Sequence, residues 1–334
     1  MLSVGSAKAP RGSKAEGFIK VGELALHSEI TIPVRIVNGK AEGPTLWLNG
    51  GVHGDELNGF LAVRNVAEAL DPRELKGALV CTPLCNPLAV QWRNKIGPYD
   101  FLDLDQQFPG DPAGQISQQI AYHLFQEIKD KAHYLINFHT AGTYYTAPPY
   151  TVFKKAPGVK PEVLGQIEHL AKAFGLKMNC QVDLSTASGE LPGNIAGALD
   201  VSCALQGIPA FMAEVGSGGK FEKENIAAAE RGIRNVMKHL GMIPGEVETA
   251  REPILITRRR FLYTQQAGFL LMEAEAGTVL PRGKTIARIL DLFSERGVLA
   301  APQDAYIIQI RTNPVVHAGD RIAFLGLEWR AFAT

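Results

Sequence analysis

The sequence predicts an α/β protein: a mixed, mostly parallel sheet with helices on both faces, followed by a small C-terminal all-β domain of barrel-sandwich type. Two observations predict this fold class. Up to about residue 241, short apolar runs alternate with segments of helical periodicity, and strands buried on both faces of a parallel sheet have such apolar sequences. After Pro253 the helical periodicity disappears, and short strands punctuated by glycine follow.

The first predicted element is a pair of antiparallel strands at an edge of the sheet. Residues 17–37 alternate apolar and polar side chains, which is typical of strands with one buried and one exposed face. The central strands are expected in the apolar runs 45–52, 77–85, 133–138 and 208–215. Helices are expected where apolar residues recur with helical spacing, over residues 55–70, 115–132, 161–176 and 221–241.

The tail contains an internal repeat. Residues 278–289 and 314–325 share the pattern V-x-x-x-G-x-x-I-A at an offset of 36 residues, which predicts the two halves of a small β-sandwich or barrel. Residues 241–253 contain Pro, Gly and charged residues, as a hinge between domains does. We therefore expect one domain over residues 1–245, with the edge strands included, and a β-rich domain over residues 253–334.

Composition excludes several classes of function. Lys and Arg together number 34, as do Asp and Glu, so the formal net charge is zero and a nucleic-acid partner is not expected. No apolar run approaches the roughly 20 residues of a membrane helix, so no membrane partner is expected. The N-terminal residues 1–17 lack the apolar centre of a signal peptide, so we expect a cytoplasmic protein.

The four cysteines are expected to be free buried thiols. Cys81, Cys180 and Cys203 lie in or beside apolar stretches, and none of the four forms a C-x-x-C pair. A metal site on Cys81 and Cys85 is disfavoured because no second thiol pair exists to complete it.

Polar residues follow three of the predicted central strands. His53 and Glu56 follow the first, His139 ends the third, and Glu214 ends the fourth. Because ligands bind at the carboxyl ends of the strands in an open parallel sheet, these four side chains are expected to meet at one rim. Two His and one Glu form a recurring catalytic zinc ligand set, and the remaining Glu would be the general base.

Other polar residues are given less weight. Asp55 either orients one of the two histidines or is an exposed acid at a helix N-terminus, and the two interpretations stay open. His123 is expected to pair with Glu127 on a helix surface. The remaining histidines have no partner pattern and are treated as structural or exposed: His27, His133, His169, His239 and His317.

Five stretches of the chain resemble one known family. G-G-V-H-G-D-E-L-N-G, C-N-P-L-A, D-L-D-Q-Q-F-P-G, N-F-H-T-A-G and F-M-A-E-V-G-S-G-G are similar to the succinylglutamate desuccinylase/aspartoacylase family, which is related to the zinc carboxypeptidases. The resemblance runs from about Gly17 to the C-terminus. It implies a zinc carboxypeptidase-like fold, and a tail like the biotinyl/lipoyl barrel. The link between the repeats of the tail, residues 291–306, has no lysine, which argues against a covalently loaded carrier.

The resemblance also implies roles for individual residues. His53, Glu56 and His139 would hold one zinc ion per chain, and Glu214 would be the general base and acid. Asn86 of C-N-P-L-A would bind substrate.

This chain departs from the family where the family grips a substrate carboxylate. The family pattern N-L-N-R-x-F-P-G stands here as D-L-D-Q-Q-F-P-G, so its second Asn and its Arg fall on Asp105 and Gln106. An arginine upstream in the family falls on Lys95, and Arg93 lies two residues earlier. Because glutamine cannot replace a guanidinium charge, Asp105 and Gln106 are expected to bind a substrate that is not a simple N-acyl aspartate or glutamate.

The expected function is zinc-dependent hydrolysis of the amide bond in a small N-acyl amino acid or related N-acylated amine. Lys95 or Arg93 would stabilise the oxyanion of the reaction. The alternatives are a carboxypeptidase-like metallopeptidase, a non-catalytic metal-binding relative, and a scaffold built around the tail. The tail is expected to shape the entrance of the site or an oligomer contact, and a homo-oligomeric state is left open.

Overall fold

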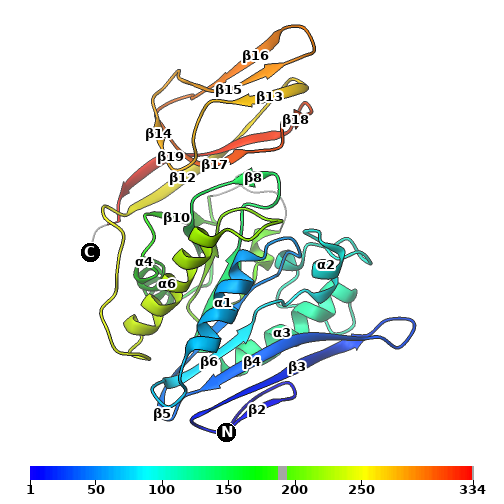
Figure 1. Cartoon of the computed structure of the whole chain (residues 1–334), viewed down its shortest axis with the longest axis vertical. Helices are drawn as coiled ribbons and strands as arrows, with labels where there is room; N and C mark the ends of the chain where they lie inside the picture. Colours follow the sequence, from blue (N-terminus) through cyan, green and yellow to red (C-terminus); the bar gives the residue numbers. More distant parts are fainter. Residues whose placement is uncertain (187–193, 333–334) are drawn as a thin grey trace.

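The protein is described by a computed structural model over residues 1–186 and 194–332. A large mixed sheet runs through the molecule, with strand order β14-β17-β19-β12-β10-β9-β11-β7-β5-β6-β4-β3 and with β8 paired to β17 at one side (Figure 1). Its strands from the N-terminal part of the chain are β3 (Ser13–Glu23), β4 (Glu29–Asn38), β5 (Ala41–Asn49), β6 (Lys76–Thr82), β7 (Tyr134–His139), β8 (Tyr145–Thr146), β9 (Tyr150–Lys155), β10 (Met178–Asp183) and β11 (Ala210–Glu214). Its strands from the tail are β12 (Ile254–Tyr263), β14 (Val279–Leu280), β17 (Ala305–Arg311) and β19 (Arg321–Ala331).

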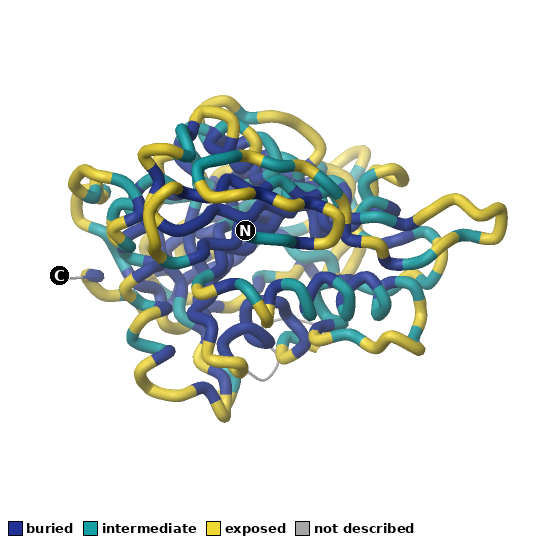
Figure 2. The backbone as a smooth tube through the Cα atoms, turned by 90° about the horizontal axis from the view of Figure 1, so that it is seen from below, coloured by how far each residue is buried: buried dark blue, intermediate teal, exposed yellow. Residues whose placement is uncertain are grey.

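The predicted edge strands are confirmed. Strands β3 and β4 pair antiparallel at the end of the sheet, and exposed and buried residues alternate along both. The turn between them projects at the right of Figures 1 and 2 and is exposed. Two short strands, β1 (Leu2–Val4) and β2 (Ala7–Ala9), form a separate hairpin that the sequence analysis did not expect.

The expectation of a mostly parallel sheet holds for its centre alone. Parallel pairs join β6 to β5, β5 to β7, β7 to β11, β9 to β10, and β10 to β12. The pair β11–β9 is antiparallel, as are the pairs at both ends of the sheet. Strands β5, β7 and β11 are therefore adjacent and parallel, and their carboxyl ends meet at one edge.

Helices cover both faces of the sheet, as predicted. On β7, Ile136 and Phe138 belong to one apolar cluster and Leu135 to another, because successive side chains of a strand point to opposite faces. The first cluster includes residues of α1 (Asn58–Ala69), α4 (Pro161–Ala173) and α6 (Lys223–His239), which lie on the same side in Figure 1. The second includes residues of α3 (Ile116–Lys131) and α5 (Leu199–Leu205), and α2 (Pro87–Trp92) lies close to the site described below.

The tail continues the main sheet across the expected hinge. The first residues of β12 pair in parallel with β10, and β12 then pairs antiparallel with β19. Within residues 241–253, the Met242 carbonyl accepts a hydrogen bond from the Lys76 amide, and the Ala250 amide donates to the Gly175 carbonyl. The segment is therefore tied to the core by backbone hydrogen bonds and is not a free linker.

The repeat of the tail forms two halves of a sandwich. The first copy covers β14 and β15 (Thr285–Leu290), and the second covers β18 (Val315–Val316) and β19. Strands β14 and β19 lie in the main sheet, whereas β15 and β18 lie in a second sheet of order β16-β15-β13-β18, with β13 (Gly268–Met272) and β16 (Glu295–Ala300). A shared apolar cluster fills the space between them.

Figure 2 shows buried backbone in the interior of the molecule, surrounded by exposed segments. Within the described ranges, none of the helices has the length and apolar character needed to cross a membrane.

Candidate active site

The site lies at the edge where β5, β7 and β11 end. Asn49, the last residue of β5, is opposite Asn137 of β7, and Glu214, the last residue of β11, is opposite His139 of β7. The register thus brings the carboxyl ends of these strands together at one edge of the sheet.

A tight turn carries the chain from β5 to His53 and Glu56. Gly51 has a φ of +60°, which favours glycine, and a Cβ on Gly54 would lie 2.0 Å from the carbonyl carbon of Ala89 in α2. Glycine is therefore favoured at position 51 by the backbone conformation and at position 54 by close packing of the turn against α2. These glycines leave the two polar side chains directed into the site.

His53, Glu56 and His139 converge, as predicted. Nδ1 of His53 lies 2.9 Å from Oε1 of Glu56, and Nδ1 of His139 lies 3.2 Å from Oε2 of the same carboxylate. The two Nδ1 atoms are 3.4 Å apart. One ligand atom from each residue lies within 4.8 Å of the others, and the three residues are buried. Over residues 1–186 and 194–332, no other group of three His, Cys, Asp or Glu residues is arranged in this way.

The electrostatics of this triad favour a cation. Burial opposes charge on His53, but Glu56 and Asp103 outweigh it and raise the pKa of His53 to about 10. Burial also opposes ionisation of Glu56, but the two histidines outweigh it and lower the pKa of that carboxyl. The carboxylates thus hold positive charge on the imidazoles, in a place where a divalent metal ion would satisfy the same groups.

Groups behind the triad hold its side chains in place. Nε2 of His53 lies 3.0 Å from Oδ1 of Asp103, and the Thr140 amide donates to Oε2 of Glu56 at 2.8 Å. Nε2 of His139 lies 2.8 Å from Nδ2 of Asn137. Asp103, Thr140 and Asn137 were not found by sequence reasoning. Asp103 and Thr140 lie beside singled-out residues, but Asp103 is 50 positions from His53 in a loop without periodicity.

A second buried network fixes the start of α1 beside Glu56. Nδ2 of Asn58 donates to the Val215 carbonyl at 2.8 Å and to Oε2 of Glu222 at 3.0 Å, and the Glu222 amide donates back to Oδ1 of Asn58. The turn that carries His53 is therefore joined to the loop that follows Glu214. Sequence reasoning missed this network as well, because its members are more than 150 residues apart.

Glu214 has the properties of a general base. Its Oε2 atom is buried and has no hydrogen-bond partner among the residues that the structure describes. Burial, assisted by the nearby charge of Glu56 and opposed by His139, raises the pKa of Glu214 to about 7. A carboxyl group with a pKa near neutrality can both take up and release a proton.

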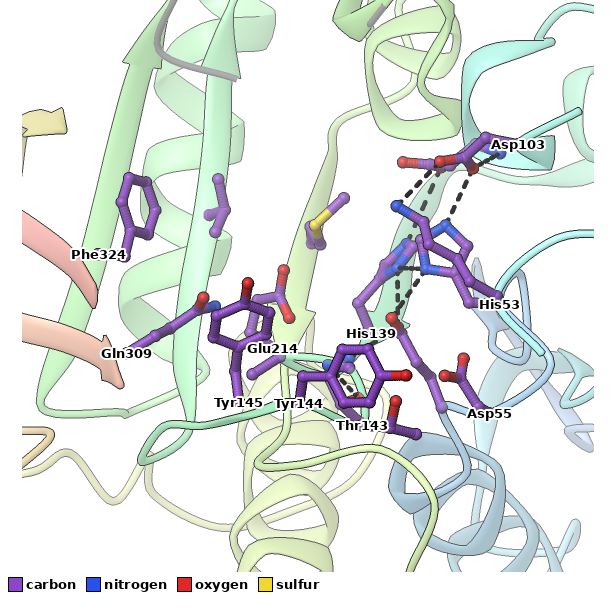
Figure 3. A pocket seen from close by; sticks show the side chains of 18 of the residues that line it. His53, Asp55, Asp103, His139, Thr143, Tyr144, Tyr145, Glu214, Gln309 and Phe324 are labelled. Carbon is purple, nitrogen blue, oxygen red and sulfur yellow. Dashed lines mark hydrogen bonds and ion pairs between the residues drawn. The ribbon is translucent and has the colours of Figure 1, made fainter. Parts of the chain in front are cut away.

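Glu214 and the three residues of the triad line a cavity of about 710 Å³. One side holds His53, Glu56, His139 and Asp103, and the loop of Thr140 to Tyr145 forms part of the wall. The tail forms another part, through Arg259, Phe261, Gln309, Arg321 and Phe324. In Figure 3, Gln309 and Phe324 lie across the pocket from His53 and Asp103, with Glu214 between them.

Asp105 and Gln106, which stand in place of the Asn and Arg of the family pattern, make hydrogen bonds within the protein. Oδ1 of Asp105 accepts from Nδ2 of Asn137 at 3.3 Å and lies 3.9 Å from Nε2 of His139. Nε2 of Gln106 donates to Asp103 at 3.3 Å, and its Oε1 accepts from the Asn194 amide at 2.9 Å. Both residues line the cavity, and both also support the groups behind the triad.

Asn86, which is expected to bind substrate, makes its hydrogen bonds within the protein. It is the N-cap of α2: its Oδ1 accepts from the Ala89 amide and its Nδ2 donates to the Val52 carbonyl. The side chain is buried and is not part of the cavity wall. Asn86 therefore positions the helix that packs against the His53 turn.

Lys95 and Arg93 both reach the cavity. Nζ of Lys95 pairs with Oδ2 of Asp103 at 3.0 Å, so the residues His53, Asp103 and Lys95 form a chain of contacts. Arg93 is the C-cap of α2, has a φ of +55°, and is exposed at the cavity.

Three lesser expectations can be compared with the structure. Asp55 makes no hydrogen bond to His53 or His139 among the described contacts; the carboxylates that contact His53 are those of Glu56 and Asp103. Glu127 pairs with Lys131 at 2.7 Å and not with His123. The four cysteines are buried thiols, as predicted.

Known proteins resemble this chain in sequence. The model of the succinylglutamate desuccinylase/aspartoacylase catalytic domain matches residues 42–240. The N-alpha-acetyl-L-2,4-diaminobutyric acid deacetylase of Halomonas elongata is 27% identical over 325 residues, which cover 92% of this chain and 90% of that protein.

Two solved structures share the fold. The product-bound ectoine utilization protein EutE (DoeB) from Ruegeria pomeroyi has a TM-score of 0.85 at 23% identity and covers 97% of this chain and 98% of its own. A succinylglutamate desuccinylase/aspartoacylase from Rhodobacter sphaeroides has a TM-score of 0.81 at 26% identity, and the match covers 93% of this chain and 95% of that one. Because the family model matches more than half of the chain, this protein belongs to the succinylglutamate desuccinylase/aspartoacylase family.

Proposed function

We propose that this protein is a zinc-dependent deacylase that hydrolyses the amide bond of small N-acyl amino acids. The observation that carries the proposal is the convergence of His53, Glu56 and His139 beside Glu214, whose pKa is raised to about 7. Relatives in the family include a deacetylase of an N-acetylated diamino acid, which supports the same class of reaction.

The donor set fits zinc. Two imidazole nitrogens and a carboxylate are ligands of catalytic zinc sites, and the Nδ1 atoms and Glu56 face one another. Cobalt or manganese would accept the same ligands. When bound, zinc would supply an acidified water and a Lewis acid for the amide carbonyl.

The side chains of the protein move the protons and hold the charge. Glu214 accepts a proton from the attacking water and passes it to the leaving amine. Asp103 and Asn137 hold the two histidine rings in position from behind. Arg93, or Lys95 from its place beside Asp103, stabilises the oxyanion that develops on the carbonyl.

The first substrate to test is Nα-acetyl-L-2,4-diaminobutyrate, the compound named for the Halomonas relative. It carries an amine that an acidic group would attract, and Asp55 and Asp105 line the cavity. N-acetylaspartate and N-succinylglutamate lack this amine, and here no arginine stands where the family grips their carboxylates.

The test is hydrolysis by chelator-treated protein that has been reloaded with zinc, alongside Glu214→Gln. We expect turnover of the acetylated diamino acid that returns with zinc and is lost in the variant. Turnover of peptides with a free C-terminus in place of N-acyl amino acids would favour the metallopeptidase. Equal inertness of wild type and variant across both panels, with zinc bound to each, would favour a non-catalytic metal-binding protein.

We also propose that residues 1–245 form the hydrolase unit and that residues 253–334 form a barrel of the biotinyl/lipoyl type whose role is to close the cavity. The two-sheet arrangement of the tail and its contribution to the cavity wall support this division.

A further inference from the structure

A row of buried polar side chains crosses three adjacent strands behind the triad. Thr82 ends β6, Asn49 ends β5, and Asn137 lies in β7. Asn49 is opposite Thr82 on one side and opposite Asn137 on the other. All three residues are fully buried, as is Trp47, two positions before Asn49. Because buried polar groups destabilise a protein unless they are hydrogen-bonded, the direction of each hydrogen bond in the row is constrained.

The row fixes which way the amide of Asn137 points. Nε1 of Trp47 can only donate, and it donates to the Thr82 hydroxyl at 2.8 Å. That hydroxyl donates to Oδ1 of Asn49 at 2.7 Å, and Nδ2 of Asn49 donates to Oδ1 of Asn137 at 2.9 Å. The NH₂ group of Asn137 therefore faces Nε2 of His139, at 2.8 Å.

Turning the Asn137 amide over is opposed from two sides. Its Nδ2 atom also donates to Oδ1 of Asp105 at 3.3 Å. If oxygen and nitrogen exchanged places, the amide oxygen would face that carboxylate, and the NH₂ group would face Nδ2 of Asn49. Both contacts would join groups of the same kind, so Asn137 keeps a donor toward His139.

A metal ion at the triad requires an acceptor behind His139. Nδ1 of His139 lies 3.4 Å from Nδ1 of His53 and 3.2 Å from Oε2 of Glu56, so Nδ1 is the atom that faces the other ligands. A neutral imidazole that binds a metal through one nitrogen carries its proton on the other, and a carboxylate, a carbonyl or water normally accepts that proton. The NH₂ group of Asn137 cannot accept it.

Asp105 is placed to supply the acceptor. Its side chain is largely buried, and its Oδ1 atom lies 3.9 Å from Nε2 of His139. The same oxygen accepts from Nδ2 of Asn137 at 3.3 Å and from the Leu199 amide at 3.4 Å, and both bonds are longer than usual. A relative movement of about 1 Å would bring this oxygen into hydrogen-bonding distance of the ring nitrogen.

We propose that Asp105 is a positioning residue of the metal site, and that its carboxylate accepts the Nε2 proton of His139 when zinc is bound. The inference rests on the metal site of the proposed function and adds a residue to it. Oδ1 of Asp103 already lies 3.0 Å from Nε2 of His53, so each histidine has its own aspartate. Asp103 begins the 3₁₀ turn Leu104–Gln106, and Asp105 lies within it. A carboxylate behind a histidine raises the basicity of the nitrogen that faces the metal, so Asp105 strengthens zinc binding through His139.

The first test is zinc affinity. Asp105→Asn keeps the shape of the side chain and removes its charge, and it should weaken zinc binding about 10- to 100-fold in competition with a chromogenic chelator. Asp100→Asn is the matched control, because Asp100 lies in the same loop but accepts hydrogen bonds from Ser117. Thermal midpoints of the zinc-free proteins check that the fold is intact. Wild-type zinc affinity in a folded Asp105→Asn overturns the proposal.

The second test begins with wild type and so does not depend on the folding of a variant. Nuclear magnetic resonance of zinc-loaded protein with isotopically labelled histidine should show the His139 proton on Nε2, shifted downfield and protected from exchange with water. Asp103→Asn should shift the ring proton of His53 alone, which tells the two signals apart. Asp105→Asn should remove the downfield shift of the His139 proton. A His139 proton on Nδ1, or one that exchanges freely or does not respond to Asp105→Asn, overturns the proposal.

Failure of the proposed function has a different signature. If wild type binds zinc at the triad but hydrolyses no N-acyl amino acid, the deacylase is rejected, and zinc affinity and the histidine signals still decide the role of Asp105. If wild type is active and Asp105→Asn raises KM without weakening zinc binding, the deacylase stands and the positioning role of Asp105 is rejected. A wild type that binds no zinc at the triad contradicts both.

Discussion

Each histidine of the triad turns one ring nitrogen toward the other ligands and the opposite nitrogen toward a polar group behind it. For His53 that group is Asp103, whose own pKa is lowered because His53 and Lys95 outweigh the effect of its burial. A carboxylate in this position fixes the ring and raises the basicity of the nitrogen that faces the metal. Asp103 is thus expected to control how tightly the metal is held.

Asp103→Asn should therefore weaken zinc binding about 10- to 100-fold while leaving the fold intact, because the amide keeps the shape and loses the charge. Competition against a chromogenic chelator measures this. Asp100→Asn is the matched control: Asp100 lies in the same loop but accepts hydrogen bonds from Ser117 at the start of α3. Equal zinc affinity of wild type and Asp103→Asn would show that Asp103 has no role in holding the metal.

The raised pKa of Glu214 predicts how the stability of the protein depends on pH. Its pKa is about 7 in the folded protein against an ordinary value of 4.5, so between these values the folded state keeps a proton that the unfolded state has released. The stability contributed by this group is complete below about pH 4.5 and is lost as the pH rises through about 7. Glu214→Gln cannot lose a proton, so the variant should gain stability relative to wild type as the pH rises.

Urea unfolding of chelator-treated wild type and Glu214→Gln at about pH 5 and about pH 8 measures this difference. The same substitution should lower the rate of the zinc-loaded enzyme about 10²- to 10⁴-fold. A stability difference between the two proteins that is the same at both pH values would mean that Glu214 is not held in its neutral form by its surroundings.

The four residues of the site could be predicted because each lies at or just after the end of an apolar strand. The residues behind them could not, because they lack this marker. Asp103 is in a loop, and Asn137 lies inside β7, where a polar residue in an apolar run gives no indication of its partner. Asn86 lies within a family motif, but the motif gives no sign that its environment makes it a helix cap.

At the scale of elements, the turn between β5 and α1 depends on the packing of Gly54 against α2. A Cβ at this position would meet the carbonyl carbon of Ala89 at 2.0 Å, and the contact is with backbone, which cannot rotate away. The turn and α2 would have to separate, and His53 would move with the turn.

Gly54→Ala should therefore destabilise the protein by about 1–3 kcal/mol and weaken zinc binding at the same time. Gly165→Ala is the control, because Gly165 lies in α4 with no atom within 4 Å of the added Cβ, and alanine there should stabilise the helix by up to about 1 kcal/mol. Urea unfolding and chelator competition give the two quantities. If the Gly54→Ala variant were destabilised but bound zinc with wild-type affinity, the packing of the turn would not control zinc binding.

The main helices and the central strands were predictable from periodicity, whereas several short elements were not. Strand β9, Y-T-V-F-K-K, lacks both a continuous apolar run and a clear alternation, and β10, M-N-C-Q-V-D, alternates apolar and polar residues over only six positions. Their place in the sheet is decided by neighbours far along the chain: β10 lies between β9 and β12. Helices α2 and α5 are too short to show a helical period.

At the scale of the whole molecule, the tail could be recognised from its change of pattern, but its attachment could not. Nothing in the local sequence of residues 254–256 shows that they pair with residues 178–180. The composition of residues 241–253 predicted a hinge, yet this segment is bonded to the core on both sides. Domain boundaries read from composition locate changes of architecture, and they do not reveal whether a sheet is continuous across them.

The continuous sheet leads to a prediction about truncation. Leu255, Ile256 and Phe332 are buried in clusters shared with the hydrolase unit, and the Phe332 ring stacks on Phe153 with centroids 6.2 Å apart. Removal of residues 253–334 would expose these surfaces and leave the edge of β10 without its partner, and an exposed edge strand promotes aggregation.

We therefore expect the chain truncated after residue 252 to aggregate and to bind no zinc at the triad, even though His53, Glu56 and His139 are all retained. Size-exclusion chromatography, near-ultraviolet circular dichroism and zinc titration measure this outcome. Phe293→Ser is the control for disturbance of the tail alone, since Phe293 is 95% exposed at the turn between β15 and β16 and should be replaceable without effect. A monomeric truncated chain that binds one zinc ion with wild-type affinity would show that the hydrolase unit folds independently. The tail would then contribute to the cavity wall and not to the stability of the core.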